Sequence, residues 1–256
     1  MGGSVAHPLI GRYKSKGHTV EKRDRVSEIL RKKSVAGDYG NSLEKIYSRL
    51  DNLSDLEVIY LVLKDDESVN DIIENQGILE AYSVMFEGAK YIPVALVACI
   101  ESYFRVQVAR IVDSHEFYKN RASQLQVKPD LKTAIDLEVN KLTIGEFISH
   151  LVKLNNIDDI NKTMTTIMGD DFLKNVSVWR EWFDNQVDLF NTSHNEKFGY
   201  MLANLKRIFE QRNLICHESY FAPETIEQLM HTKDVVNFIG AANGFIDSHI
   251  KNKKAS

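Results

Sequence analysis

The stretch RNLICH, from Arg212 to His217, combines two side chains that can act together on a phosphate ester. The planar guanidinium of Arg212 offers paired donors to two phosphate oxygens. The imidazole of His217 exchanges protons near neutral pH, which suits a general base or a general acid. RNA carries its own nucleophile, the 2′-hydroxyl, so this pair of residue types suits cleavage of RNA without a metal ion.

The spacing within RNLICH decides which of its side chains can meet. Asn213 and His217 are four residues apart, so on a helix they share a face and the Asn213 amide can orient the His217 ring. Arg212 and His217 are five apart, roughly 140° around an ideal helix, and converge only if the helix ends soon afterwards. Spacing alone is weak support, because Arg110 and His115 repeat it in RIVDSH. The interpretation therefore depends on the elements around the motif.

The composition is that of an ordinary soluble globular protein. The chain has 256 residues, of which 43% are hydrophobic and 27% charged. It has no uninterrupted apolar run of about 18 residues and no visible signal peptide, so we expect a cytoplasmic protein that does not span a membrane. Its two cysteines, Cys99 and Cys216, are expected to be buried free thiols. No Gly-rich phosphate loop, His-Glu-x-x-His pair or Cys-x-x-Cys occurs, so no cofactor or metal site is predicted.

The charges are distributed unevenly along the chain. Residues 1–34 hold nine Lys or Arg against three acidic residues, a balance of +6, while the whole chain carries −4. The remainder therefore carries −10. A basic arm can contact phosphates, but a solvated or partly disordered terminus is an equally good interpretation of this segment.

The hydrophobic pattern predicts an all-α protein. The four prolines all fall where helices should start or break, and there is no sustained period-2 run of β-branched residues. Residues 92–115 are apolar nearly all round, so this helix should be central and buried, and Thr143 with Glu146 forms a predicted capping box. We expect a basic arm at 1–40 and one domain at 41–256. The predicted helices are 19–33, 41–53, 54–66, 68–89, 92–115, 130–142, 143–155, 157–168, 171–190, 196–218 and 222–252.

Three features of this chain resemble the HEPN superfamily of all-α domains from prokaryotic defence and toxin–antitoxin systems. RNLICH matches the HEPN signature of Arg, a polar residue, three others and His, with Asn213 at the polar position, which Ile111 occupies in RIVDSH. The central segment VALVACIESYFRVQVARIV places Glu101 to Arg105 in a typical HEPN context. The segment TIGEFISHLVKLNNIDDINKTM is similar to that of the RiboL-PSP-HEPN subfamily. The resemblance covers about 88–250, which implies a HEPN-like helical bundle with additional N-terminal helices.

The resemblance implies a metal-independent endoribonuclease of a toxin–antitoxin or antiviral defence system. In such an enzyme Arg212 would bind the scissile phosphate, His217 would act as base or acid, and Asn213 would orient the site. Glu101 would steady Arg212 or Asn213, and Arg105 and Tyr220 are further candidates for RNA binding. One histidine per chain implies a homodimer with a composite site.

A second interpretation remains open. Many HEPN domains are not nucleases and serve as helical interaction or regulatory modules, for example as partners of an antitoxin.

Overall fold

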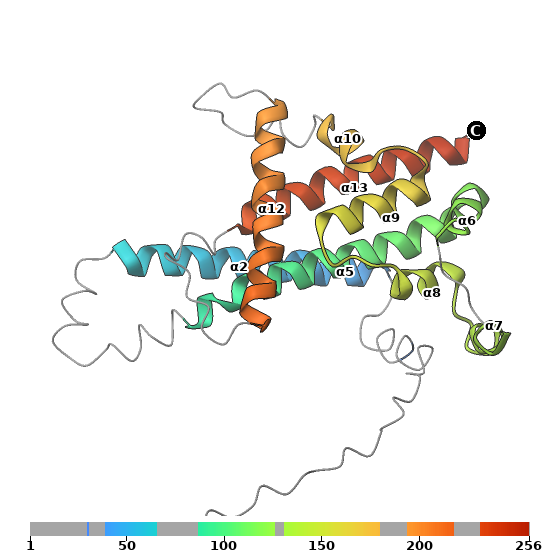
Figure 1. Cartoon of the computed structure of the whole chain (residues 1–256), viewed down its shortest axis with the longest axis horizontal. Coiled ribbons are helices and arrows are strands. Elements are labelled where there is room, and N and C mark those ends of the chain that lie inside the picture. Colours follow the sequence, from blue (N-terminus) through green and yellow to red (C-terminus); the bar gives the residue numbers. More distant parts are fainter. Residues whose placement is uncertain are drawn as a thin grey trace, which may run out of the picture.

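The computed structural model describes residues 30, 39–65, 87–125, 131–179, 194–217 and 231–255. Among these residues 87% are helical and none lies in a strand, so the predicted all-α helical bundle is confirmed. Apart from Leu30, the helix predicted at 19–33 lies outside the described residues, as does most of the one predicted at 68–89. The helices of Figure 1 are α2 (Tyr39–Asp65), α5 (Tyr91–Ser114), α6 (Glu116–Ala122), α7 (Leu131–Val139), α8 (Ile144–Leu151), α9 (Ile157–Met168), α10 (Phe172–Ser177), α12 (His194–His217) and α13 (Thr232–Ala255).

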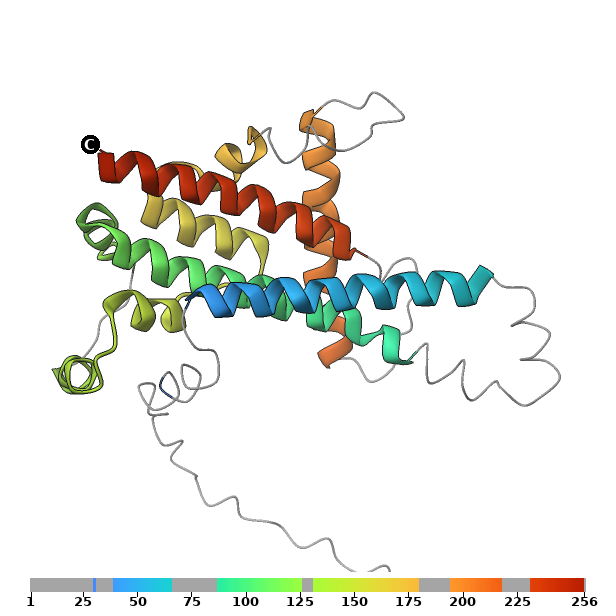
Figure 2. The ribbon, with the colours of Figure 1, turned by 180° about the vertical axis from the view of Figure 1, so that it is seen from behind.

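Helix α5 is the centre of the bundle, as its apolar sequence predicts. It contacts α2, α6, α8, α9, α12 and α13. Pro93 lies in its first turn, where a missing backbone N–H breaks no helical hydrogen bond. Helices α2, α5, α9 and α13 run along one another, whereas α12 crosses them (Figures 1 and 2). The helices around α12 therefore all pack on one buried helix, α5.

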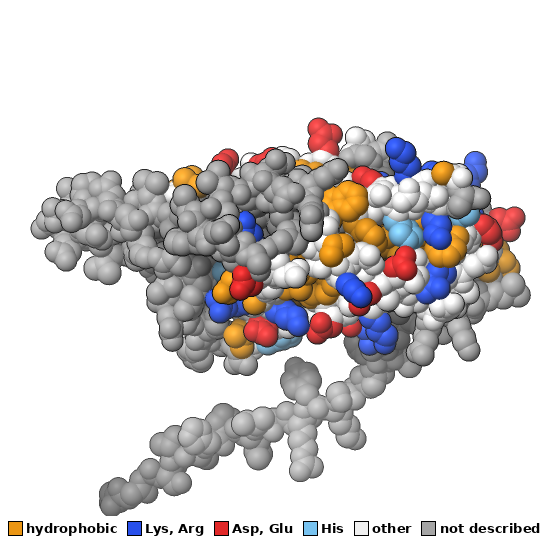
Figure 3. Space-filling model, turned by 90° about the horizontal axis from the view of Figure 1, so that it is seen from above, with side chains coloured by type: hydrophobic (Ala, Val, Ile, Leu, Met, Phe, Trp, Pro, Cys, Tyr) orange, Lys and Arg blue, Asp and Glu red, His pale blue; other side chains and the backbone are white. Residues whose placement is uncertain are grey.

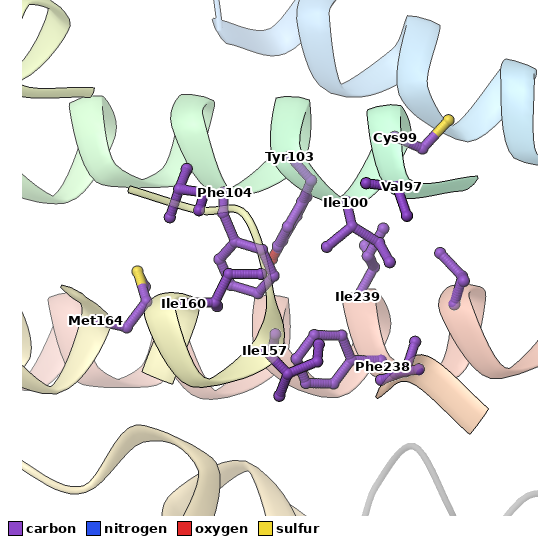
Figure 4. Packing of buried hydrophobic residues seen from close by; sticks show 14 of the residues in the cluster. Val97, Cys99, Ile100, Tyr103, Phe104, Ile157, Ile160, Met164, Phe238 and Ile239 are labelled. Atoms are coloured by element: carbon purple, nitrogen blue, oxygen red, sulfur yellow. The ribbon is translucent and has the colours of Figure 1, made fainter. Parts of the chain in front are cut away.

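Aromatic side chains of α5 fill the core between α5, α9 and α13. Tyr103 and Phe104 point from α5 toward Ile157 and Ile160 of α9 and toward α13 (Figure 4). The Phe104 ring lies 5.8 Å from that of Phe172, at an interplanar angle of 87°, which is the edge-to-face geometry that aromatic quadrupoles favour. Each large side chain buried in this way stabilises the fold by about 1.5–3 kcal/mol.

A polar network fixes α13 against α5 within this apolar core. The fully buried Gln107 donates to Asn243 Oδ1 (3.2 Å) and accepts from Arg110 Nε (2.8 Å). Arg110 Nη2 lies 2.7 Å from Asp247 Oδ1, and Asn243 donates to Asp247 Oδ2 (2.9 Å). Because Gln107 is fully buried, its amide needs these partners, and shifting α13 along α5 would remove the Asn243 acceptor.

The start of α8 is held by its own residues and by α5. The predicted capping box is confirmed, because Thr143 Oγ1 accepts from the Glu146 amide (3.0 Å) and Glu146 Oε2 accepts from the Thr143 amide (2.9 Å). Asp113 of α5 adds two acceptors, for the Thr143 hydroxyl (2.6 Å) and for the Gly145 amide (3.0 Å). Gly145 sits so close to α5 that a Cβ at this position would overlap the Ala109 carbonyl oxygen.

Several predicted boundaries are wrong. Residues 41–53 and 54–66 were expected to form two helices, but α2 runs unbroken from Tyr39 to Asp65. No glycine or proline interrupts it after Gly40, and one apolar face continues along it through Ile46, Leu50, Leu53 and Tyr60. Helix α10 ends at Ser177, with the Val178 and Trp179 amides closing its last turn, and residues 180–190 of the helix predicted at 171–190 lie outside the described residues.

The helix predicted at 143–155 also ends early. Helix α8 stops at Leu151, and Val152 to Asn156 lead into α9. Asn156 must adopt extended backbone (φ −157°, ψ 173°) to cap α9, where its side chain accepts from the Asp159 amide (2.7 Å). Helix α8 itself ends because Val152 has extended backbone (φ −70°, ψ 146°), and the Asn155 carbonyl lies in the connection, where it accepts from Arg212 of α12.

The helix Glu87–Ser114 passes the length and composition test for a membrane span. However, 61% of its apolar window is buried inside the protein, and the core helix of a soluble protein passes the same test.

The division into a basic arm at 1–40 and one domain at 41–256 stays a prediction, because most of the arm lies outside the described residues. Leu30, just inside that arm, packs against a small cluster that includes Leu142 and Phe147.

Glu57 of α2 caps α13 from a neighbouring helix. Its Oε1 accepts from the Thr232 backbone amide (2.9 Å) and from the Thr232 hydroxyl (2.5 Å). Burial nevertheless raises the pKa of the Glu57 carboxyl, because the loss of water outweighs these hydrogen bonds. The hydrogen bonds of this cap therefore favour the Glu57 carboxylate, but its burial disfavours the charge by more.

The raised pKa of Glu57 predicts a pH dependence of stability. A carboxyl whose pKa is higher in the folded state adds stability below its unfolded pKa, and that contribution is lost as pH rises through the folded value. Glu57→Gln keeps an acceptor for Thr232 but cannot ionise. We expect the free energy of unfolding of this variant, relative to that of wild type, to increase as the pH rises above about 4, the ordinary pKa of a glutamate. Urea denaturation at a series of pH values above this point measures it, and a difference that stays flat or shrinks would contradict the expectation.

Candidate functional site

The RNLICH motif forms the C-terminal end of α12. This helix buries one stripe against the bundle, and its members recur at helical spacing: Phe198, Met201, Leu205, Ile208 and Phe209. Arg212 follows this stripe by one turn, and His217 is the last residue of α12 that the structure describes. The His217 end of α12, the darker orange end in Figures 1 and 2, lies beside the N-terminal half of α5. The buried stripe thus sets where the motif stands relative to α5.

Arg212 is held by contacts to α5 and to the connection between α8 and α9. Its Nη2 lies 3.4 Å from Glu101 Oε1 and donates to the Asn155 carbonyl oxygen (3.2 Å). The side chains of Arg212 and Glu101 are each 23% exposed. The guanidinium carbon lies 5.9 Å from the centre of the Phe209 ring, and Arg212 Nε is buried without a hydrogen-bond partner. The guanidinium of Arg212 is therefore held in place, but one of its hydrogen-bond donors, Nε, has no partner.

Asn213 and His217 are both exposed, on the outward side of α12. They stand one helical turn apart on one face, as their spacing predicts. The structure thus brings Glu101 and Arg212 together at the base of the site and leaves Asn213 and His217 at its surface. Orientation of the His217 ring by Asn213 stays a prediction. A solvent-facing imidazole at a helix end is open to substrate and to a second chain.

Of the two further candidates for RNA binding, the structure describes only Arg105. Arg105 Nη1 donates to the Ser149 carbonyl oxygen (2.8 Å), so its guanidinium ties α5 to α8. This contact gives Arg105 a structural role, and its contact with RNA stays a prediction. Tyr220 lies outside the described residues.

Sequence reasoning missed Asn155 and the Lys206–Asp158 pair. Asn155 holds Arg212 through its backbone carbonyl, which every residue type carries, so no signal in the sequence could have identified it. Lys206 of α12 lies 3.7 Å from Asp158 in the first turn of α9. Both contacts join α12 to residues 155–158, at the start of α9.

The second Arg/His pair at the same spacing has a structural explanation. Arg110 joins the network of Gln107 and Asp247 described above. His115 is the N-cap of α6, where its Nδ1 accepts from the Phe117 amide (3.1 Å). The two segments share the same Arg-to-His spacing, so it does not distinguish them. The residue after the arginine does, since it is Asn213 in RNLICH and Ile111 in RIVDSH.

A chain of hydrogen bonds runs from the buried Tyr118 through His249 to the exposed Asp170. The Tyr118 hydroxyl lies 2.7 Å from His249 Nδ1, and His249 Nε2 lies 3.2 Å from Asp170 Oδ2. Burial raises the pKa of Tyr118 to about 12, so its hydroxyl is a poor acid. The tautomer of His249 sets which atom donates in each of the two contacts. This arrangement fastens α6, α13 and the end of α9 together and does not activate Tyr118 as a nucleophile.

The cysteines differ from each other. Cys99 is buried, as expected, and burial raises the pKa of its thiol. The expectation for Cys216 is wrong: it is exposed, because the last turn of α12 extends past the stripe that packs on the bundle. Among the residues that the structure describes, no group of three His, Cys, Asp or Glu side chains could hold a metal ion.

The charge on the visible surface is mixed. On the face seen from above, basic, acidic and apolar side chains are interspersed over the described residues (Figure 3). A single-sign stripe of the kind that tracks a nucleic-acid backbone is not present among the described residues of that face.

No protein-family model matches this chain, and no curated protein and no solved structure was found to match it.

Proposed function

We propose that this protein is a metal-independent endoribonuclease whose site is built from the C-terminal turn of α12. The single observation that carries the proposal is the placement of the motif. A partly buried arginine held by Glu101 and an exposed histidine stand within five residues at a helix end. The arginine can hold the scissile phosphate and the histidine can move one of the two protons transferred when the 2′-hydroxyl attacks. The resemblance to HEPN domains supports the same assignment.

Each residue takes a role suited to its surroundings. Arg212 binds a non-bridging oxygen of the scissile phosphate and stabilises the charge that develops there. His217 removes the proton of the 2′-hydroxyl or donates a proton to the departing 5′-oxygen. Asn213 orients the ring of His217. The products are a 2′,3′-cyclic phosphate and a 5′-hydroxyl.

One histidine cannot serve as base and acid in the same step, so we propose that two chains share a composite site. His217 and Asn213 face outward at the end of α12, where a second copy can approach. A two-fold axis beside this turn would place two Arg212 side chains and two His217 rings around one phosphodiester. The positive balance of +6 in residues 1–34 supports a further contact with RNA.

The biological setting belongs to the same proposal. We place the enzyme in a toxin–antitoxin or antiviral defence system, with RNA as substrate and an antitoxin or regulatory protein as a partner.

Chelation tests the chemistry. We expect the purified protein to cleave single-stranded RNA in excess EDTA as fast as without it, because neither proposed role is filled by a metal ion. Denaturing gels of a mixed RNA pool, with and without EDTA, give the two rates. Cleavage that stops in EDTA and returns with a divalent cation would contradict the mechanism.

A non-catalytic helical interaction module is the second candidate, and one observation favours it. Arg212 Nη2 already has two partners within the protein, which suits a structural arginine. If the protein leaves varied RNAs intact under all conditions, this function replaces the first.

A further inference from the structure

Arg212 is paired inside the protein in a way that leaves its anion-binding edge half used. The Nε and Nη2 atoms lie on one edge of the guanidinium, the edge that grips two oxygens of a carboxylate or phosphate. Here Nη2 meets Glu101 at 3.4 Å, longer than the usual charge-assisted hydrogen bond, and Nε has no partner. Glu101 therefore satisfies this edge only in part.

From this geometry we infer that Glu101 is a built-in competitor for the phosphate, so that Arg212 rests in a masked state until RNA displaces the carboxylate. The inference rests on the proposed function, since it concerns regulation of the same site. A phosphate with two oxygens on Nε and Nη2 satisfies both donors, including the one that is buried without a partner. The exchange replaces a long single contact with a bidentate one.

Electrostatics give this exchange a cost that controls affinity. A phosphate on Arg212 would stand next to the Glu101 carboxylate, and two negative charges at this separation repel. Glu101 is 23% exposed, so its carboxylate can turn toward water as the phosphate arrives. Contacts with the Phe209 ring and the Asn155 carbonyl do not depend on Glu101 and keep the guanidinium in place. RNA binding thus requires loss of the Glu101 contact without loss of the Arg212 position.

This inference and a purely supportive role for Glu101 predict opposite signs. If Glu101 only positions Arg212, neutralising it loosens the arginine and weakens RNA binding. If Glu101 competes with the phosphate, neutralising it strengthens binding. Glu101→Gln is the suitable variant because it keeps the shape of the side chain and removes its charge.

The experiment measures binding without cleavage. The probe is a single-stranded, mixed-sequence 2′-O-methyl oligonucleotide, which lacks the attacking hydroxyl, and the readout is its Kd by fluorescence anisotropy. We expect Glu101→Gln to bind about fivefold more tightly than wild type, the effect of removing one partly exposed ion pair. Glu116→Gln changes net charge equally on the exposed first turn of α6 and is the matched control. It should bind as wild type does.

Arg212 must be the residue through which the gain acts. In an Arg212→Gln background, Glu101→Gln should produce no gain. The inference is overturned if Glu101→Gln binds no more tightly than Glu116→Gln, if the gain survives Arg212→Gln, or if no variant binds the probe. Failure of the proposed function is distinguishable, because it would show as intact natural RNA in the EDTA assay while the gain of Glu101→Gln on the uncleavable probe remained.

Discussion

His217→Ala is expected to lower the rate of RNA cleavage about a hundred- to ten-thousand-fold, the usual contribution of one general acid or base. An imidazole can both accept and donate a proton, whereas the methyl group of alanine can do neither. The fold should survive, since His217 is exposed at a helix end. Cleavage of a labelled RNA by wild type and variant at equal concentration measures the effect.

His115→Ala is the matched control for this experiment. His115 completes the other Arg/His pair at the same spacing, but its imidazole caps α6. It should weaken that cap and leave the cleavage rate unchanged. If His217→Ala cuts RNA as fast as wild type, or if both alanine variants lose activity equally, the assignment of His217 is wrong.

Gly145→Ala is expected to lower the free energy of unfolding by about 3 kcal/mol, at the upper end of the range for overpacking a close contact. A Cβ at this position overlaps the Ala109 carbonyl oxygen and lies 2.7 Å from Asp113 Cγ. The first obstacle is backbone of the central helix α5, which cannot shift without disturbing the core. The second is the side chain that caps α8. Urea denaturation followed by circular dichroism measures the loss as a lower midpoint at unchanged slope.

Gly199→Ala is expected to raise the free energy of unfolding, the opposite of the effect of Gly145→Ala. Gly199 is exposed on α12, and a Cβ there meets nothing within 4 Å. Alanine should stabilise the protein by roughly 0.5–1 kcal/mol through helix propensity.

Equal midpoints for Gly145→Ala and wild type would show that α8 does not approach α5 as closely as described.

The sequence predicted those parts of the fold that depend on local patterns. The buried helix at 92–115 follows from a run that is apolar on all sides, and the Thr143–Glu146 capping box from two residues three apart. The prediction failed where a long-range or neighbouring demand decided the outcome. Helix α8 ends at Leu151, where Val152 turns to extended backbone, and the close approach of Gly145 to α5 is visible only when both helices are in place.

The site shows the same division. Residue types and spacing made Arg212, Asn213 and His217 candidates, and the resemblance predicted Glu101 as a neighbour of Arg212 or Asn213. The structure places Glu101 beside Arg212. The Asn155 carbonyl carries no sequence signal, and the burial of Arg212 Nε depends on how α12 packs beside α5 and residues 152–156. These unpredictable contacts decide whether Arg212 is ready for phosphate or masked.

The chemical ends of the RNA fragments test the central claim most directly. Fragments made by the wild-type protein in EDTA should carry a 2′,3′-cyclic phosphate on one side of the cut and a 5′-hydroxyl on the other, because the 2′-oxygen attacks its own phosphate. Mass spectrometry of the fragments, with ligation assays for the 5′ end, reads both groups. Fragments with a 3′-hydroxyl and a 5′-phosphate would show that water, and not the 2′-hydroxyl, is the nucleophile, and would contradict the mechanism built on Arg212 and His217.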